Sequence, residues 1–219
     1  MDLRKAPEKW RLYVITDEVL SRGRLHVEIA EAAIAGGADV IQLRDKTAST
    51  LKLYEAALEI RRLTMNSGVP LIVNDRLDIA LAVGADGLHV GQDDLPAPIA
   101  RRLLGSNKIL GVSARSLEEA LQAEKDGADY LGVGPVFEAR STKSDAGEPL
   151  GLKLIKSVRE HCNKPVVAIG GITHSNAFDV IQAGAHCVSV ISAVVSAEDI
   201  TKAARTLKRI ISAEGNSGS

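Results

Sequence analysis

Eight short runs of aliphatic and β-branched residues alternate along the chain with longer segments of helical period, and very few folds are compatible with such a pattern. The runs lie at residues 11–16, 39–45, 70–75, 87–92, 109–114, 130–137, 165–172 and 187–194. Residues 49–65 show the helical period, because Leu51, Tyr54 and Leu58 recur at intervals of three or four. Eight such units in 219 residues average roughly 27 residues each, as in a compact parallel barrel. The sequence therefore predicts an α/β protein with a single (β/α)8 TIM-barrel domain over residues 1–219, in which the barrel spans about 11–211.

A weak internal repeat precedes every second run. Its four copies are Gly37-Ala38-Asp39, Gly84-Ala85-Asp86, Gly127-Ala128-Asp129 and Gly184-Ala185-His186. A glycine at this place ends the preceding helix, and the polar residue begins the next strand. Because barrel chemistry lies at the other end of the strands, we interpret the repeat as a recurring structural turn and not as part of a catalytic site.

One segment, residues 138–149 (EARSTKSDAGEP), has neither helical period nor apolar content. It follows the sixth run and therefore lies at the carboxyl end of the barrel. Long polar loops in compact domains commonly bind ligands, so we predict an active-site loop here. The last residues, 214–219 (EGNSGS), are small and polar, which predicts a flexible tail.

Charge and composition exclude several classes of protein. The formal net charge is −1, which argues against a nucleic-acid binder or a basic membrane-surface protein. No apolar run approaches the roughly 18 residues of a membrane helix. Cys162 and Cys187 form no CxxC or metal-ligand spacing, which predicts free thiols in a reducing cytoplasm. Since hydrophobic residues make up 45% but aromatic residues only 3%, we expect an aliphatic core. The predicted partners are small molecules, with no nucleic acid and no membrane, and a homo-oligomer is left open.

Charged and polar residues collect where the second, third and fourth runs end and in the 138–149 loop. They are Gln42, Arg44, Lys46, Asn74, Asp75, Asp94, Ser141, Thr142 and Lys143. Alternation along the second run predicts that Gln42, Arg44 and Lys46 point to the same side. A single aspartate at a strand end often caps a helix, but Asp75 and Asp94 share one barrel mouth with three cations. Such a set suits a polyphosphate with a divalent metal, bound by carboxylates and neutralised by Arg and Lys.

The seventh and eighth runs end across the mouth, where barrels often bind a phosphate group. Gly171 allows close approach of a backbone, and N–H groups near Ser192 lie at the start of a helix. We predict a monophosphate site there. The alternative is that the Gly170-Gly171 pair serves packing.

Several of these segments together resemble thiamine-phosphate synthase. They are residues 42–46 (QLRDK), 73–76 (VNDR), 88–94 (LHVGQDD), 111–113 (GVS), 134–137 (GPVF), 142–146 (TKSDA) and 168–172 (AIGGI). The resemblance runs from the first run to the eighth, and the motifs are jointly very specific. It implies an enzyme that joins hydroxymethylpyrimidine diphosphate to thiazole phosphate and releases diphosphate and thiamine monophosphate. With a carboxylated thiazole substrate, carbon dioxide is lost as well.

The resemblance also implies roles for individual residues. The pyrimidine diphosphate is expected at Gln42, Arg44, Lys46, Asn74, Ser113, Thr142 and Lys143, Mg²⁺ at Asp75 and Asp94, and the thiazole phosphate at Gly171, Ile191 and Ser192. Arg44, Lys46 and Lys143 are the expected catalytic residues, because they neutralise the departing diphosphate together with Mg²⁺. Ionisation of the aminopyrimidine followed by capture needs no nucleophile or strong base. We therefore expect His89 to be a hydrogen-bonded barrel histidine and not an acid or base.

The 138–149 loop departs from the family pattern, since it is one residue longer and lacks the first threonine. Either Arg140 or Ser141 could take over that contact to phosphate. A thiazole tautomerase of the same fold is an alternative, although it binds no diphosphate and needs no pair of metal-binding aspartates. A non-catalytic barrel that binds thiamine precursors is another. The sequence leaves open which form of thiazole phosphate is preferred.

Overall fold

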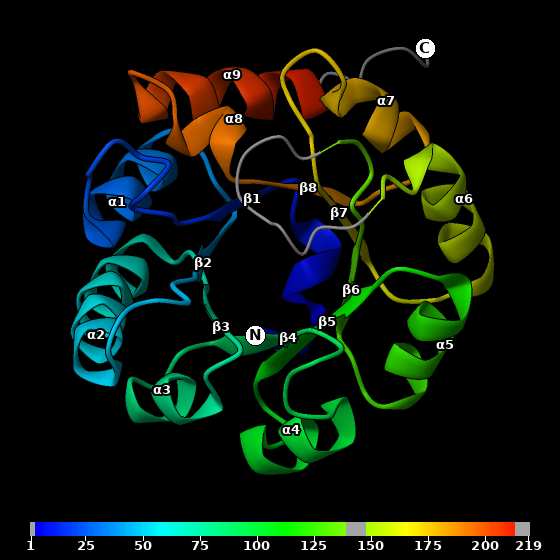
Figure 1. The fold of residues 1–219 in the computed structure, drawn as a ribbon, viewed down its shortest axis with the longest axis horizontal. Coiled ribbons are helices and arrows are strands. Elements are labelled where there is room, and N and C mark those ends of the chain that lie inside the picture. Colours follow the sequence, from blue (N-terminus) through cyan, green and yellow to red (C-terminus); the bar gives the residue numbers. More distant parts are fainter. Residues whose placement is uncertain (1–2, 139–147, 213–219) are drawn as a thin grey trace.

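The predicted alternation of strands and helices closes into a barrel in the computed structural model, which describes residues 3–138 and 148–212. Each strand pairs in parallel with its neighbour in the chain, and β8 pairs with β1 (Figure 1). The strands are β1 (Leu12–Ile15), β2 (Val40–Leu43), β3 (Leu71–Asn74), β4 (Gly87–Val90), β5 (Ile109–Ala114), β6 (Tyr130–Val133), β7 (Val166–Ile169) and β8 (Cys187–Val190). The predicted (β/α)8 barrel is thus confirmed.

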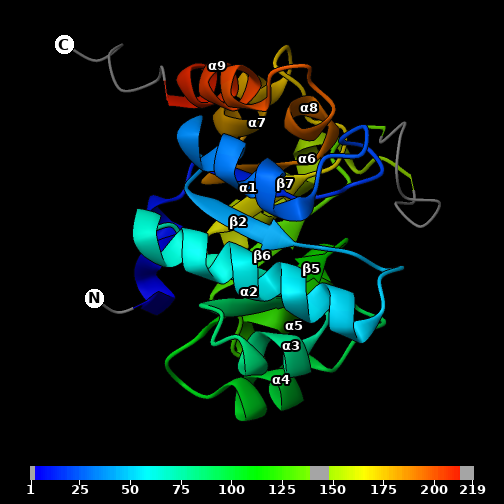
Figure 2. The ribbon, with the colours of Figure 1, turned by 90° about the vertical axis from the view of Figure 1, so that its left-hand side faces the viewer.

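Helices surround the barrel, as two perpendicular views show (Figures 1 and 2). They are α1 (His26–Ala35), α2 (Thr50–Ser67), α3 (Leu77–Ala82), α4 (Ala97–Leu104), α5 (Leu117–Lys125), α6 (Gly151–His161), α7 (Ala177–Gln182), α8 (Ser192–Val195) and α9 (Ile200–Ser212), with a 3-10 helix η1 (Leu3–Lys9) before β1. The predicted helix at 49–65 is α2, which Ser49 caps by accepting a hydrogen bond from Lys52 N, and which ends at the left-handed Gly68. No helix within the described ranges combines the length and apolar character needed to cross a membrane.

Several strands are shorter than predicted. The run at 130–137 ends as a strand at Val133, because Gly134 and Pro135 follow and proline has no N–H for the ladder. The run at 187–194 is a strand only to Val190, and its last residues belong to α8. Val194 is fully buried in that short helix, so its hydrophobic character did not distinguish strand from helix.

The Gly-Ala-Asp/His repeat forms side-chain clamps at the amino end of the barrel, which confirms its structural interpretation. The polar residue of each copy accepts a hydrogen bond from the first strand of its pair and donates its own backbone N–H to the same residue. The clamps join Asp39 to Leu12, Asp86 to Leu71, Asp129 to Leu110 and His186 to Val166. Each clamp ties an even strand to the odd strand before it.

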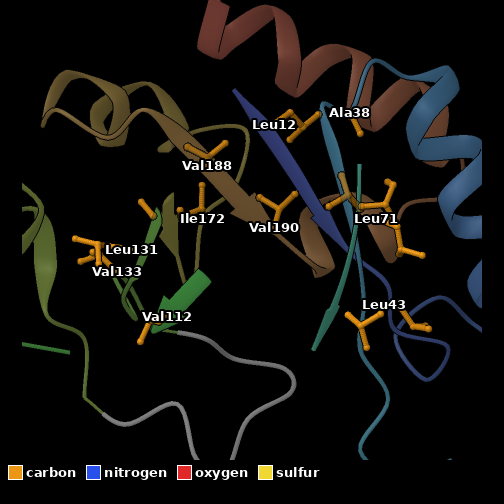
Figure 3. Packing of buried hydrophobic residues seen from close by; sticks show 14 of the residues in the cluster. Leu12, Ala38, Leu43, Leu71, Val112, Leu131, Val133, Ile172, Val188 and Val190 are labelled. Carbon is orange, nitrogen blue, oxygen red and sulfur yellow. The ribbon is translucent and has the colours of Figure 1, made fainter. Parts of the chain in front are cut away.

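Two separate cores lie on the two faces of the barrel wall. The outer core, between strands and helices, is aliphatic as expected, with Leu12, Leu71 and Val188 among its members (Figure 3). The inner core contains Trp10, Tyr13 and Tyr130, so the expectation of a wholly aliphatic core is wrong for the barrel interior. The three rings meet edge-on or tilted, with centroids 5.4–6.0 Å apart. Helix η1 reaches the amino end of this interior, where Ala6 joins the same cluster.

Candidate active site

The cations after β2 approach the end of β3. Because β2 ends at Leu43, the predicted alternation covers only Gln42, and the loop beyond the strand places Arg44 and Lys46. Lys46 Nζ lies 4.0 Å from Asp75 Oδ2, and the charges of Lys46 and Arg44 partly offset the burial and the Asp94 contact that raise the pKa of Asp75. Arg44 is half-buried and Lys46 is exposed. The structure therefore brings two of the three predicted catalytic cations to one carboxylate.

An anionic anchor holds the loop that carries these cations. Asp45 Oδ1 accepts hydrogen bonds from Thr47 N at 2.8 Å and Ala48 N at 2.9 Å. Asp45 Oδ2 lies 3.3 Å from Nε2 of the buried His26, whose Nδ1 is 2.8 Å from Thr16 Oγ1. Partial burial acts to raise the pKa of Asp45, but these hydrogen bonds outweigh it and lower the pKa to about 2. Sequence reasoning assigned no role to Asp45 or His26, although an acidic residue between two cations was a signal.

Two aspartates face each other at the ends of β3 and β4. Asp75 has a left-handed backbone with φ 59°, and its N–H donates to His89 O at 2.8 Å. Asp94 Oδ2 accepts from Gly91 N at 2.8 Å. Burial, followed by the hydrogen bond and the negative charge of Asp94, raises the pKa of Asp75 to about 6 despite the nearby cations. Two carboxylates held in one place without a cation between them raise each other's energy, and a bound cation relieves that repulsion.

Ser113 lies on β5, next to the strand that carries His89. Its Oγ is 2.9 Å from His89 Nε2, and its backbone oxygen accepts from Gln92 Nε2 at 2.7 Å. His89 Nδ1 is 2.9 Å from Tyr130 Oη, so both ring nitrogens have partners inside the protein. This is the hydrogen-bonded barrel histidine that we expected. Asn74, the last residue of β3, is half-buried beside His89 in the strand register.

The predicted monophosphate residues lie across the mouth, at the ends of β7 and β8. Gly171 has φ +63°, and a Cβ there would approach Glu138 O to 2.7 Å and Phe137 Cβ to 2.8 Å. The packing alternative for this glycine therefore has direct support. Ile191 precedes α8 and packs partly against both cores, while Ser192 begins α8 and is exposed. Contact with a phosphate remains a prediction for all three residues.

The remaining predicted residues belong to the loop after β6. Thr142 and Lys143, together with the open candidates Arg140 and Ser141, lie outside the described residues, as does most of the predicted 138–149 loop. The predicted tail at 214–219 also lies outside them. Where the chain is described again, Leu150 N donates to Pro135 O at 2.8 Å and Gly151 N to Val136 O at 3.0 Å. These two bonds fix the base of the loop beside the end of β6.

Comparison with known proteins gives a consistent result. A family model described as thiamine monophosphate synthase matches residues 12–194. A thiamine-phosphate synthase from Chloroflexus aurantiacus is 61% identical over 203 residues, which are 93% of each chain. One from Moorella thermoacetica is 55% identical over 93% of this chain and 96% of the relative. The solved structure of thiamine phosphate pyrophosphorylase from Pyrococcus furiosus matches with a TM-score of 0.87 and 44% identity, over 94% of this chain and 98% of the other.

Proposed function

The chain belongs to the thiamine monophosphate synthase family, and from that premise we propose that it joins hydroxymethylpyrimidine diphosphate to thiazole phosphate. In this reaction the bond from the pyrimidine methylene carbon to a diphosphate oxygen breaks, and a bond from that carbon to the thiazole nitrogen forms. The products are diphosphate and thiamine monophosphate, with carbon dioxide when the thiazole is carboxylated. The observation that carries the proposal is the facing pair Asp75 and Asp94 beside Arg44 and Lys46.

This observation also favours a synthase over the two alternatives. A tautomerase acting on thiazole phosphate alone has no use for a second group of cations and carboxylates at β2 to β4. A barrel that only senses precursors does not need two carboxylates in a mutually unfavourable arrangement. The relatives with 55% and 61% identity are both named as synthases.

A divalent cation such as Mg²⁺ fits the donors that Asp75 and Asp94 offer, because Mg²⁺ prefers carboxylate oxygens. In the described part of the chain, no group of three or more His, Cys, Asp or Glu side chains could hold a metal. Two protein ligands suit Mg²⁺, which usually keeps water and substrate phosphate oxygens as its other ligands. When bound, Mg²⁺ supplies positive charge to the departing diphosphate.

The chain's own residues bind and orient the substrates and neutralise the charge of the diphosphate. Arg44 and Lys46 offset the charge that develops on the leaving diphosphate, and Lys143 is expected to join them from the loop after β6. Gln42, Asn74 and Ser113 orient the pyrimidine diphosphate so that its methylene carbon faces the thiazole nitrogen. No residue has to act as a nucleophile in this reaction, and the carboxylates of Asp75 and Asp94 are assigned to the metal.

Gly171, Ile191 and Ser192 are proposed to hold the thiazole phosphate on the opposite side, with Thr142 on the loop completing the diphosphate site. The two substrates would then meet across the open end of the barrel. We propose a cytoplasmic location, since both cysteines, Cys162 and Cys187, are buried free thiols.

The test is to mix both substrates with the purified protein and to measure thiamine monophosphate and diphosphate, with Mg²⁺ and with a chelator. We expect equal amounts of the two products with Mg²⁺ and none with the chelator. No product in the presence of Mg²⁺ would refute the synthase assignment. An unchanged rate in the chelator would refute the metal assignment alone.

A further inference from the structure

Five polar side chains form a continuous hydrogen-bonded chain across the barrel interior. Gln42 Nε2 donates to Tyr13 Oη at 2.7 Å, and Tyr13 Oη lies 2.9 Å from Tyr130 Oη. Tyr130 Oη lies 2.9 Å from His89 Nδ1, and His89 Nε2 lies 2.9 Å from Ser113 Oγ. The two ends of this interior chain, Gln42 and Ser113, are substrate-binding residues in the proposed function. Its three middle members have no part in the reaction described so far.

The barrel interior has room for the middle members only because glycines stand opposite them. A Cβ on Gly111 would lie 2.0 Å from Tyr130 Cζ, and one on Gly132 would lie 2.9 Å from His89 Cε1. The Tyr130 ring stacks on His89 with an interplanar angle of 27°. Tyr13 and Tyr130 are both buried, and Trp10 packs its ring against both. The rings are therefore held in fixed positions, and their hydroxyl oxygens cannot move to other partners without repacking.

Because a buried hydroxyl hydrogen needs an acceptor, the interior chain can satisfy all its hydroxyls in one direction of donation. The amide nitrogen of Gln42 can only donate, so the Tyr13 oxygen accepts and its one proton is left for Tyr130. The Tyr130 proton is then left for His89 Nδ1, so His89 carries its own proton on Nε2 and donates it to Ser113 Oγ. Burial raises the pKa of both tyrosines, so both keep their protons.

This direction determines what the two ends offer to a ligand. Ser113 already accepts from His89, so its hydroxyl hydrogen is available to an acceptor. Gln42 donates its amide nitrogen inside the barrel, so its carbonyl oxygen Oε1 is the part of the amide left for a ligand. Reversing either end would require every bond of the interior chain to reverse together. The mouth thus presents a carbonyl oxygen and a hydroxyl hydrogen at the same time.

We propose that Tyr13, Tyr130 and His89 are positioning residues that fix the hydrogen-bonding polarity of Gln42 and Ser113. The ligand that matches is an aminopyrimidine diphosphate, whose amino group donates and whose ring nitrogen and phosphate oxygens accept. The inference rests on the proposed function, since it assumes that this substrate contacts both ends. It adds a source of orientation deep in the barrel, away from the metal and the cations.

The main test is Tyr130→Phe, which keeps the ring and removes the central hydroxyl. We expect KM and Kd for the pyrimidine diphosphate to rise about tenfold, because the ends lose their fixed polarity. KM for thiazole phosphate should change less than twofold. Tyr13→Phe, which breaks the interior chain at its other phenol, should raise the same two constants. Steady-state kinetics and titration calorimetry of the folded variants measure these effects.

Ser189→Ala is the matched control. Ser189 Oγ is a buried hydroxyl on β8 with no hydrogen-bond partner among the described residues, and its strand position faces the same interior. Removing it takes away one interior hydroxyl without touching the interior chain. All kinetic constants should therefore match those of the unmodified protein. A change in this variant as large as in Tyr130→Phe would mean that any altered interior disturbs the site.

A spectroscopic measurement tests the direction itself. The ¹⁵N spectrum of the unmodified protein should show His89 as the neutral tautomer protonated on Nε2, with its signals assigned by their loss in His89→Gln. The other tautomer, or unchanged pyrimidine diphosphate constants in both tyrosine variants, would overturn the inference. If the unmodified protein makes no thiamine monophosphate, the proposed function fails, and the tautomer still decides the direction of the interior chain.

Discussion

Aspartates at the two ends of the barrel are held in opposite ways. At the amino end, Asp129 accepts from Leu110 N, from Arg4 Nε at 2.7 Å and from Arg101 at 2.5 Å. At the carboxyl end, Asp75 faces another carboxylate, and Lys46 comes no closer than 4.0 Å. The first arrangement satisfies a buried charge completely. In the second, a carboxylate faces a like charge and has weaker contacts with cations, at the open mouth of the barrel.

The difference shows what each end contributes. Hydrogen bonds and cations around a carboxylate stabilise the folded chain, as at Asp86, which binds both Arg61 and Leu71 N. Facing carboxylates lower stability, and a fold keeps them where a ligand supplies the missing charge. The aspartates at the amino end therefore stabilise the folded chain. Those at the carboxyl end destabilise it somewhat, and we expect them to bind a cation. Four measurements can break or sharpen this comparison.

The largest expected effect is at the carboxyl end. Asp94→Asn should lower kcat/KM by about a thousandfold, because one metal ligand is lost where the diphosphate leaves. Its thermal midpoint should stay the same or rise, since a like-charge contact disappears. Asp93→Asn, an exposed neighbour in the same loop, is the control and should keep full activity. Diphosphate release and calorimetric melting measure both outcomes, and a fully active Asp94→Asn would contradict the metal assignment.

At the amino end we expect the opposite result, a large loss of stability with little loss of activity. Asp129→Ala leaves two arginines and a strand N–H without their acceptor, so we expect the free energy of unfolding to fall by about 3 kcal/mol. The folded fraction should keep its kcat/KM within a factor of two. Urea denaturation and product assays provide the two values. A variant with normal stability and poor activity would mean that the amino end takes part in the reaction.

A smaller loss is expected at Asp86, which has a single arginine partner. Asp86→Asn should lower the free energy of unfolding by about 1–2 kcal/mol, because the amide keeps an acceptor for Leu71 N but loses the charge that faces Arg61. Arg61→Gln, measured in the same urea series, should show a similar loss. If the double variant lost the full sum of both, the ion pair would not be the cause.

The smallest effect is a dependence of stability on pH in metal-free protein. The pKa of Asp75 is about 6 in the folded chain against 3.8 for the free group, so the folded state binds more protons between these values. Stability from this group is therefore full below pH 4 and is lost as the pH rises through 6. The thermal midpoint of the unmodified protein minus that of Asp75→Asn should fall by a few degrees as the pH rises across this range. A fall of about this size follows from the change in the pKa of Asp75 on folding. A difference that rose with pH would have the wrong sign.

Much of the fold could be predicted because its signals are local. Runs of Val, Ile and Leu located all eight strands, and the Gly-Ala-Asp/His repeat located the turns before four of them. The strand ends were less certain, as at Val194, because aliphatic residues continue into a helix. The inner core could not be predicted, since the meeting of Tyr13 and Tyr130 depends on barrel closure and not on neighbouring residues.

For the candidate site, the structure bears only on which predicted residues lie near one another, and their roles stay predictions. Strand ends and the family motifs located Arg44, Lys46, Asp75 and Asp94, and the structure places these four together. The anchor at Asp45 and His26 was missed, because Asp45 lies in the loop after β2 and His26 begins α1, 19 residues earlier. Hydrogen bonds of that kind depend on the packed fold, and no periodic pattern in the sequence predicts them.

The clamps at the amino end also bear on the order in which the barrel assembles. They join residues only 27, 15, 19 and 20 positions apart, so each can close within one βαβ unit at a modest entropic cost. The bond between Tyr13 and Tyr130 spans 117 positions and forms only when the first and sixth strands share a closed wall. We therefore expect the four clamped strand pairs to form before the barrel closes. The Tyr13–Tyr130 bond of the interior chain should form last.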